Sequence, residues 1–186
     1  MPQTDASMTV EDFLVWAEAR PGRHELVDGR PCAMAPERVG HAEAKFAAQT
    51  ALRQAIGRAG VPCHMLPDGV TVRIDARTAY DPDALVYCGA RLSRNTTVVV
   101  SPVIVVEVLS PSTGFFDRHG KLAGYFTVLS VRHYLTVDID RRIVIHHERP
   151  PGDGREALLT RLLPSGPLRL DPPGLEVTVE DLLGPP

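Results

Sequence analysis

Apolar residues at helical spacing mark three segments of the chain. Residues 9–20 open on a capping-box pattern and continue with apolar positions three and four apart, which predicts an amphipathic helix. A third helix is expected from about residue 117 to 129, although two glycines weaken it and packing must hold it. Residues 40–58 form the longest helical pattern, and its apolar side is expected to carry Phe46, Leu52 and Ile56.

Shorter runs rich in β-branched residues predict strands. Two of these runs flank Asp28-Gly29, which is a strong signal for a β-hairpin. The other runs cover residues 61–66, 70–74, 83–87, 103–109, 132–138, 142–147, 156–163 and 175–179. The two last runs are expected to extend the edge of the sheet. Residues 103–109 form the most apolar run, which indicates a strand covered on both faces in the middle of a sheet.

One charged residue, Glu107, interrupts this central run. A carboxylate removed from water is costly unless a cation, a metal ion or several donors meet it. The side chain therefore either turns to solvent or to an arginine at the strand end, or takes part in a site. The neighbouring segments of the sequence favour a site.

Two segments supply groups that could meet Glu107. Upstream, Pro82-Asp83 opens a short apolar run, and downstream Asp117, Lys121 and Tyr125 recur at four-residue intervals on one helix face. Two acids on adjacent strands followed by a lysine are the parts of a magnesium-dependent phosphodiesterase. Carboxylates bind a hard cation that keeps several waters. A nearby ammonium can orient the attacking water or offset charge in the transition state.

The order of these residues resembles a known family. The segments that carry the resemblance are Glu25-Leu26-Val27-Asp28-Gly29, His41, Pro82-Asp83, residues 106–113, and the ladder of Asp117, Lys121 and Tyr125. In this order they resemble the Uma-type family of restriction-endonuclease-like proteins, a branch of the PD-(D/E)XK nuclease superfamily. The resemblance covers nearly the whole chain, from about residue 9 to residue 183.

The resemblance implies a fold and a metal site. The fold would be α/β (α+β), with a restriction-endonuclease-like mixed central sheet flanked by helices and extra antiparallel strands at the edge. Asp83, Glu107 and the backbone carbonyl of Val108 would hold Mg²⁺ or Mn²⁺. The superfamily places a lysine where this chain has Leu109. The Uma-type branch resembles this sequence in carrying that lysine on the next helix, so its role passes to Lys121.

Four further residues are expected to support the site, namely Glu25, His41, Asp117 and Tyr125. Asp117 or Tyr125 would orient Lys121, while Lys121 would position the attacking water or help to deprotonate it. Glu25 could equally be a surface strand residue, and His41 a helix cap or a packed ring.

The implied activity is endonucleolytic hydrolysis of DNA phosphodiester bonds. The missing strand lysine and the acidic net charge favour an alternative, a catalytically inactive nuclease-fold module for dimerisation or DNA binding. A metal-dependent hydrolase of another phosphate ester is a third interpretation. A homodimer is expected, because two sites conveniently cut the two strands of a duplex.

The bulk composition limits the partners. The 186 residues suit one domain, residues 1–186. No apolar stretch is long enough to cross a membrane and no secretion signal is recognisable, so a cytoplasmic protein is expected. The formal net charge of −3 argues against indiscriminate coating of nucleic acid. A local basic wall could still be supplied by Arg20, Arg23, Arg30 and Arg38.

Two rare residue types add expectations. Lys45 and Lys121 are the only lysines in a chain whose default basic residue is arginine, which gives Lys121 weight as a functional residue. The three cysteines, Cys32, Cys63 and Cys88, are odd in number and widely spaced. They predict reduced thiols rather than a disulfide or a zinc site.

Overall fold

The computed structural model describes residues 7–109, 115–150 and 158–185, and of residues 115–119 only the backbone. Its helices are α1 (Val10–Glu18), α2 (Val39–Ala59), α3 (Phe115–Thr127) and α4 (Val179–Leu183). Its strands are β1 (His24–Val27), β2 (Arg30–Ala33), β3 (Cys63–Pro67), β4 (Thr71–Arg73), β5 (Ala79–Tyr80), β6 (Ala84–Cys88), β7 (Val98–Val99), β8 (Ile104–Val108), β9 (His133–Asp138), β10 (Ile143–Glu148), β11 (Leu159–Leu163), β12 (Pro167–Leu170) and β13 (Leu175–Thr178). Among these described segments, no helix is both long enough and apolar enough to span a membrane.

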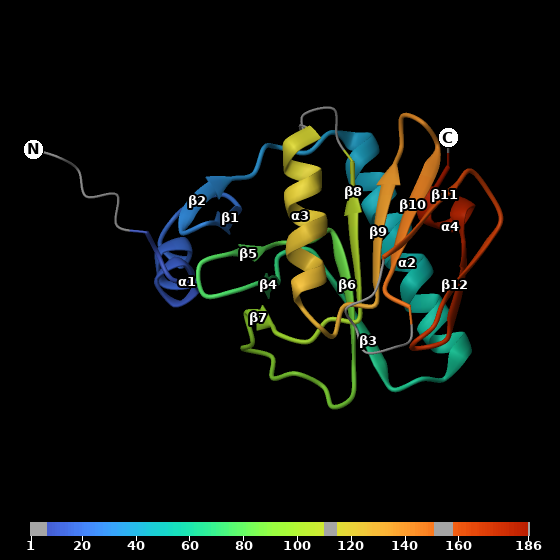
Figure 1. Cartoon of the computed structure of the whole chain (residues 1–186), viewed down its shortest axis with the longest axis horizontal. Coiled ribbons are helices and arrows are strands. Elements are labelled where there is room, and N and C mark those ends of the chain that lie inside the picture. Colours follow the sequence, from blue (N-terminus) through green and yellow to red (C-terminus); the bar gives the residue numbers. More distant parts are fainter. Residues whose placement is uncertain (1–6, 110–114, 151–157, 186) are drawn as a thin grey trace, which may run out of the picture.

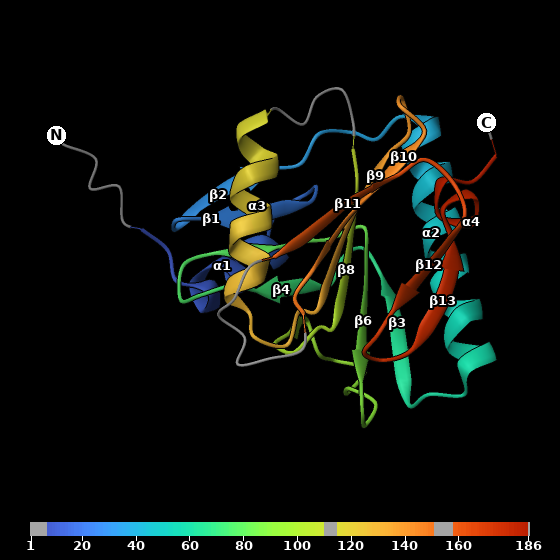
Figure 2. The same ribbon diagram turned by 45° about the vertical axis from the view of Figure 1, so that its right-hand side comes forward.

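The principal sheet has six strands in the order β11-β10-β9-β8-β6-β3. Strands β8 and β9 run parallel, and the other neighbours pair antiparallel. Figure 1 shows α3 in front of this sheet and α2 behind it, and the turned view of Figure 2 keeps the sheet between the two helices. The expected mixed sheet flanked by helices is therefore confirmed.

Strand β8 lies inside this sheet and is covered on both faces, as its apolar run predicts. Ile104, Val106 and Val108 belong to the core that contains the buried face of α2. Val105 belongs to the second core, together with Tyr125 of α3. Because side chains alternate along a strand, Glu107 follows Val105 onto the α3 face. The same pleat that buries the valines thus directs the one charge of this strand toward α3.

Helix α2 packs through small side chains. Its buried residues are Ala44, Ala48, Ala51, Leu52 and Ala55. Phe46, expected on the apolar side, is instead 71% exposed. Leu52 is buried and Ile56 partly buried, as predicted. The alanines form the inward stripe, which lets the helix lie close to the sheet, and Phe46 falls outside that stripe.

A second, five-stranded sheet has the order β2-β1-β5-β4-β7. The predicted hairpin joins β1 to β2, and Asp28 and Gly29 have φ angles of 50° and 79°, as a two-residue turn with positive φ at both positions requires. Helix α1, with its predicted capping box, packs Phe13 against Leu26 of β1 in a small core. This sheet is what carries Glu25 toward the principal one.

The C-terminal strands correct one expectation. Strand β11 extends the edge of the principal sheet as predicted, but β13 pairs with β12 in a separate two-stranded sheet. Buried residues of this pair pack into the α2 core together with α4. The expectation for residues 175–179 was wrong because the partner strand β12 was not recognised.

The cysteines correct a second expectation. Cys63 and Cys88 are joined by a disulfide, whereas reduced thiols were predicted. The two residues stand directly opposite each other in the antiparallel pair of β3 and β6. Their sequence separation of 25 residues gives no hint of this, because the pairing depends on the register of two strands. Cys32 is exposed and is not part of a disulfide.

Candidate active site

The two acids singled out in the sequence meet at one end of the principal sheet. Ala84 of β6 pairs with Val106 of β8, so the next step of the same register sets Asp83 opposite Glu107. Opposite residues of an antiparallel pair project from the same face. Asp83 is 4% exposed and the side chain of Glu107 is 12% exposed, so both carboxylates are largely withdrawn from water.

Glu107 has the partners that its burial requires. Its Oε1 lies 3.2 Å from the Nζ of Lys121 and accepts a hydrogen bond of 2.8 Å from the hydroxyl of Tyr125. The pKa of Glu107 is raised to about 8, chiefly by burial; Lys121 acts to lower it, while Asp83 and Glu25 act to raise it. The single ammonium of Lys121 thus only partly offsets the effect of burial and of the two neighbouring acids on the pKa of Glu107.

Lys121 is held between two carboxylates. Its Nζ donates to Glu25 Oε1 at 2.8 Å and lies 5.6 Å from the centre of the Tyr80 ring. Burial by itself would lower the pKa of Lys121, but Glu107 and Glu25 outweigh burial and raise this pKa above its ordinary value. The raised pKa keeps this side chain an ammonium at neutral pH.

Glu25 comes from β1 of the other sheet and is buried. The same Oε1 that binds Lys121 also accepts the backbone N–H of Asp81 at 2.9 Å. Tyr125, expected to orient Lys121, donates to Glu107 instead. Asp117, the other residue expected in that role, has its side chain outside the described residues. The described partner that orients Lys121, together with Glu107, is Glu25.

The glycine at position 124 has a packing role. An added Cβ at Gly124 would lie 2.8 Å from Cε2 of Tyr80, which is closer than real contacts allow. Since Lys121 stands on the same helix and over the same ring, the close approach of α3 to Tyr80 also sets the position of the ammonium. A residue that weakens the helix intrinsically therefore brings it close to the site.

Asp83 is fixed by the backbone of β8. Its Oδ2 accepts the N–H of Val108 at 2.7 Å. Burial raises the pKa of Asp83, and the Val108 N–H and His41 act in the opposite direction. His41, in the first turn of α2, places Nε2 3.0 Å from the carbonyl oxygen of Val108 and 3.7 Å from Asp83 Oδ2. The expected supporting residue His41 thus lies beside two of the three expected metal ligands, Asp83 and the Val108 carbonyl.

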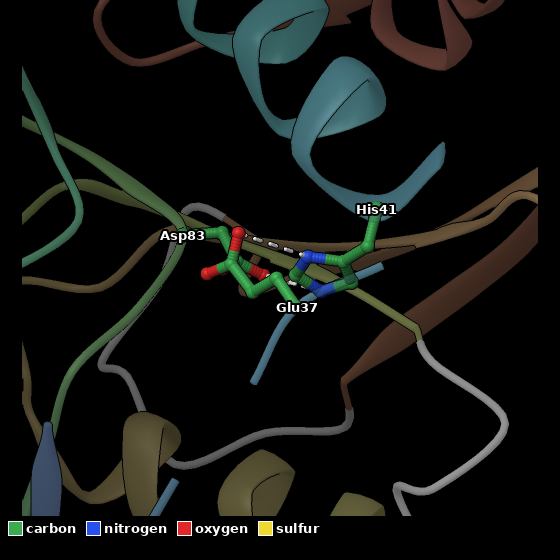
Figure 3. A group of neighbouring side chains, drawn as sticks. All are labelled: Glu37, His41 and Asp83. Atoms are coloured by element: carbon green, nitrogen blue, oxygen red, sulfur yellow. Dashed lines mark ion pairs between the residues drawn. The ribbon is translucent and has the colours of Figure 1, made fainter. Parts of the chain in front are cut away.

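One residue beside Asp83 was missed. Glu37, His41 and Asp83 each offer a ligand atom within 4.8 Å of the others. Figure 3 shows these three side chains together. The four-residue spacing of Glu37 and His41 at the start of a helix could have indicated that the two side chains meet.

The proposed basic wall is only partly present. Arg23 binds three carboxylates, with its guanidinium nitrogens 3.1 Å from Glu37, 2.6 Å from Asp68 and 2.8 Å from Asp81. Arg20 lies 4.2 Å from the centre of the Trp16 ring. Arg30 and Arg38 are exposed. Arg23 therefore belongs to an internal network rather than to a surface for phosphates.

The residues at this end of the sheet fit a divalent cation. The described hydrogen bonds of Asp83 and Glu107 go to Oδ2 and Oε1, so the second oxygen of each carboxylate is suited to bind an ion. The Val108 carbonyl, which accepts from His41, has a second lone pair. When Glu25, Asp83 and Glu107 are all ionised, they set three negative charges against the one positive charge of Lys121, and a divalent ion would balance the difference.

Comparisons with known proteins identify the family of this chain. Residues 10–180 match the model of the family Uma2, described as a putative restriction endonuclease. The chain belongs to the Uma2 family. An uncharacterized protein of Synechocystis, slr1290, is 30% identical over 148 residues, which cover 78% of this chain and 77% of that protein.

A solved structure extends the comparison to the fold. A putative nuclease of the DUF820 group from Anabaena variabilis superposes with a TM-score of 0.71, at 13% identity, over 95% of this chain and 97% of that one. At this identity the likeness establishes the fold. Membership of the Uma2 family confirms the resemblance drawn from the sequence and supports a nuclease function.

Proposed function

We propose that this Uma2 protein is an endonuclease that hydrolyses DNA phosphodiester bonds with the help of Mg²⁺ or Mn²⁺. One observation carries the proposal: the ammonium of Lys121 lies 3.2 Å from Glu107 at the sheet end where Asp83 stands opposite. Two acids and a cation in one buried place are what a metal-assisted phosphodiesterase needs.

In this mechanism Asp83, Glu107 and the Val108 carbonyl hold the ion. When bound, the metal ion polarises the phosphate and lowers the pKa of a coordinated water. Lys121 stays protonated because its pKa is raised, so its part is to orient the water and offset the charge that develops on the phosphate. Glu25 holds Lys121 at the required place, and Tyr125 holds the carboxylate of Glu107.

The proposal is tested by nicking of supercoiled plasmid DNA. The wild type should nick with Mg²⁺ or Mn²⁺ and stop when a chelator is added, and Asp83→Asn should lose the activity. Asp171→Asn, at an exposed acid that pairs with Arg169 beyond the principal sheet, is the matched control and should nick normally. Nicking by Asp83→Asn at the wild-type rate would refute the assignment of the metal ligands.

A non-catalytic DNA-binding or dimerisation module is the second candidate. This alternative is favoured because the ammonium of Lys121 already forms ion pairs with Glu25 and Glu107 in the absence of substrate. Calorimetric titration with Mn²⁺ separates the candidates, because a catalytic site binds the ion and loses it in Asp83→Asn. A protein that binds duplex DNA and neither binds Mn²⁺ nor nicks would be such a module.

We also propose that two copies act together on a duplex. Each chain offers one set of Asp83, Glu107 and Lys121, whereas a duplex has two strands to cut. Sedimentation with and without duplex DNA would measure the oligomeric state, and a monomer under both conditions would refute this part of the proposal alone.

A further inference from the structure

We propose that strand β11 is the surface through which two copies of this chain form a dimer, by antiparallel pairing of β11 with β11 of the second copy. In the part of the chain that the structure describes, β11 is the last strand of the principal sheet and pairs with β10 alone. The edge of a sheet presents backbone N–H and C=O groups that can pair with another strand. The inference supplies the surface for the proposed joint action of two copies, and it rests on the proposed function for its consequence on DNA only.

Apolar side chains are exposed along this edge. Leu162 is 65% exposed, and Leu158 and Leu159 are 40% and 44% exposed. Natural proteins usually protect an edge strand with charges or prolines along it. The one charged residue of β11 is Arg161, and its guanidinium lies 2.7 Å from Glu148 of the neighbouring strand β10. The strand therefore carries little that would prevent pairing.

The opposite edge of the principal sheet is better protected. It is formed by β3, which follows Pro62 and ends on Pro67. A proline has no N–H to give to another strand. The apolar side chains of β3 are also less exposed, since Met65 and Leu66 pack partly buried against the two cores. Of these two edges, β11 is the one suited to pairing.

The sequence of β11 favours one register. Identical chains usually pair about a two-fold axis, so the strand meets itself. An axis perpendicular to the sheet through Thr160 sets Leu158 opposite Leu162 of the second copy. The same axis sets Leu159 opposite Arg161. Apolar pairs and a pair of threonines directly opposite each other both stabilise an antiparallel ladder.

The neighbouring registers are less favourable. An axis through Arg161 would set two guanidinium groups directly opposite each other, and like charges in that position are destabilising. An axis through Leu162 would set Pro164 opposite Thr160 and bring a proline into the ladder. We therefore assign the axis to Thr160.

The proposed interface lies on the same face of the sheet as the candidate active site. Cross-strand neighbours form one row from Glu107 through Thr136 and Ile145 to Leu162. Residues of such a row project from one face. A two-fold axis perpendicular to the sheet keeps this face common to both copies. Strands lie about 4.8 Å apart, which puts the two sites roughly 30–40 Å apart, on the order of one turn of a B-form duplex.

Sedimentation velocity over a range of protein concentrations tests the interface on the full chain. The wild type should sediment as a dimer without DNA. Leu162→Lys should raise the dimer dissociation constant by about tenfold or more, because it places a charge in the apolar pair. Phe46→Ser is the matched control, because Phe46 is 71% exposed on α2, the helix that covers the other face of the sheet. A monomeric wild type, or a dimer that survives Leu162→Lys, would overturn the inference.

A pair of opposite charges tests the register. Leu158→Glu alone should weaken the dimer as Leu162→Lys does. In the chain that carries both changes, each new carboxylate would lie opposite a new ammonium of the second copy, so the dimer should recover. A double variant that dimerises no better than either single variant would overturn the register centred on Thr160.

Cross-linking at the axis tests the same contact without a charged variant. In a Cys32→Ser background Cys63 and Cys88 are joined to each other, so Thr160→Cys supplies the reactive thiol. A short bismaleimide should link two copies through this position and should not link Phe46→Cys in the same background. Cross-linking through position 46 and none through position 160 would overturn the inference.

Nicking separates this inference from the proposed function. One site cuts one strand, so Leu162→Lys should nick supercoiled plasmid as the wild type does and linearise it more slowly. If the wild type is a dimer cross-linked through Thr160→Cys and never nicks, the interface stands and the proposed function fails. If the wild type nicks and is a monomer, the proposed function stands and the interface fails.

Discussion

The two lysines of the chain occupy similar places with opposite consequences. Each side chain is 11% exposed, and each ammonium lies between two carboxylates: Lys121 between Glu25 and Glu107, Lys45 between Glu37 and Asp68. Around Lys45 the guanidinium of Arg23 adds a second cation. Around Lys121 a third acid, Asp83, raises the pKa of Glu107 further.

The difference in the number of cations appears in the pKa values of Glu107 and Glu37. The pKa of Glu107 is raised to about 8, chiefly by burial, with Lys121 unable to offset burial and the neighbouring acids. Burial also acts to raise the pKa of Glu37, but Lys45, His41 and Arg23 outweigh burial and the pKa is lowered. Two cations lie among the acids around Lys45, whereas the acids around Lys121 have one cation, and this shortage supports the metal site proposed for them.

The largest expected effect comes from removing the ammonium of the cation-poor cluster. Lys121→Met should reduce metal-dependent plasmid nicking by about 100-fold to 1000-fold, the usual loss for a group that stabilises charge in the transition state. Single-turnover rates at saturating Mg²⁺ measure this loss. A rate within a factor of three of the wild type would remove Lys121 from the mechanism.

The other lysine should affect stability instead. Lys45→Met leaves Glu37 and Asp68 with Arg23 alone, which should lower the free energy of unfolding by about 1–3 kcal/mol. Urea unfolding followed by circular dichroism measures the change. Nicking at a temperature where both proteins are folded should fall less than tenfold. A Lys45→Met protein with wild-type stability and no nicking activity would contradict the structural role assigned to Lys45.

The buried pair of His133 and His146 differs from both lysine clusters, because its two side chains are uncharged. Both residues are 0% exposed, His133 Nε2–H donates to the Pro172 carbonyl at 3.0 Å, and His133 Nδ1 therefore accepts from His146 Nε2–H at 2.9 Å. The pKa of His146 is lowered to about 3, chiefly by burial and in smaller part by its neighbours His133, Arg161 and His147.

The stability of the protein should therefore fall in acid. Below about pH 6.5 the unfolded chain protonates His146 and the folded chain does not, so the unfolding free energy drops by about 1.4 kcal/mol per pH unit, down to the folded pKa. His146→Gln keeps a donor for His133 and removes the titration. Its stability should depend on pH less steeply between pH 6 and pH 4 by about that slope. Equal slopes in both proteins would contradict the neutral pair.

The smallest expected effect separates two glycines of α3. Gly120→Ala meets no described atom within 4 Å and should stabilise the protein by about 1 kcal/mol through helix propensity. Gly124→Ala gains the same propensity but collides with Tyr80, so it should destabilise by about 1 kcal/mol and slow nicking by shifting Lys121. Thermal unfolding of the two variants measures the contrast. Rescue of Gly124→Ala by Tyr80→Ala would identify the ring as the obstacle.

The sequence was informative where a residue broke a local pattern. Glu107 stands out in an apolar strand, and its need for a partner led to Asp83 and Lys121, which the structure brings to the same place. The family resemblance and the helical spacing pointed to Tyr125, but they did not predict that its hydroxyl donates to Glu107. The central sheet and its covering helices followed from periodicity in the same way.

The rest depends on contacts between distant segments. The scarcity of lysine drew attention to Lys121 but applies equally to Lys45, whose network depends on where Arg23 and Asp68 come together. The disulfide of Cys63 and Cys88 depends on strand register. Phe46 looked buried because a helical pattern gives a face without saying how close the neighbouring layer comes.

Glu25 reaches Lys121 from a hairpin that belongs to a different sheet, so the position of the Lys121 ammonium depends on the strand register of that hairpin. Side chains alternate along β1, so a shift of one residue would turn Glu25 away and present His24 or Leu26 instead. A single insertion in this hairpin would thus remove the contact of Glu25 with Lys121 while every proposed metal ligand stays in place. Relatives that keep both acids and the helix lysine should be judged by their hairpin length before they are counted as active enzymes.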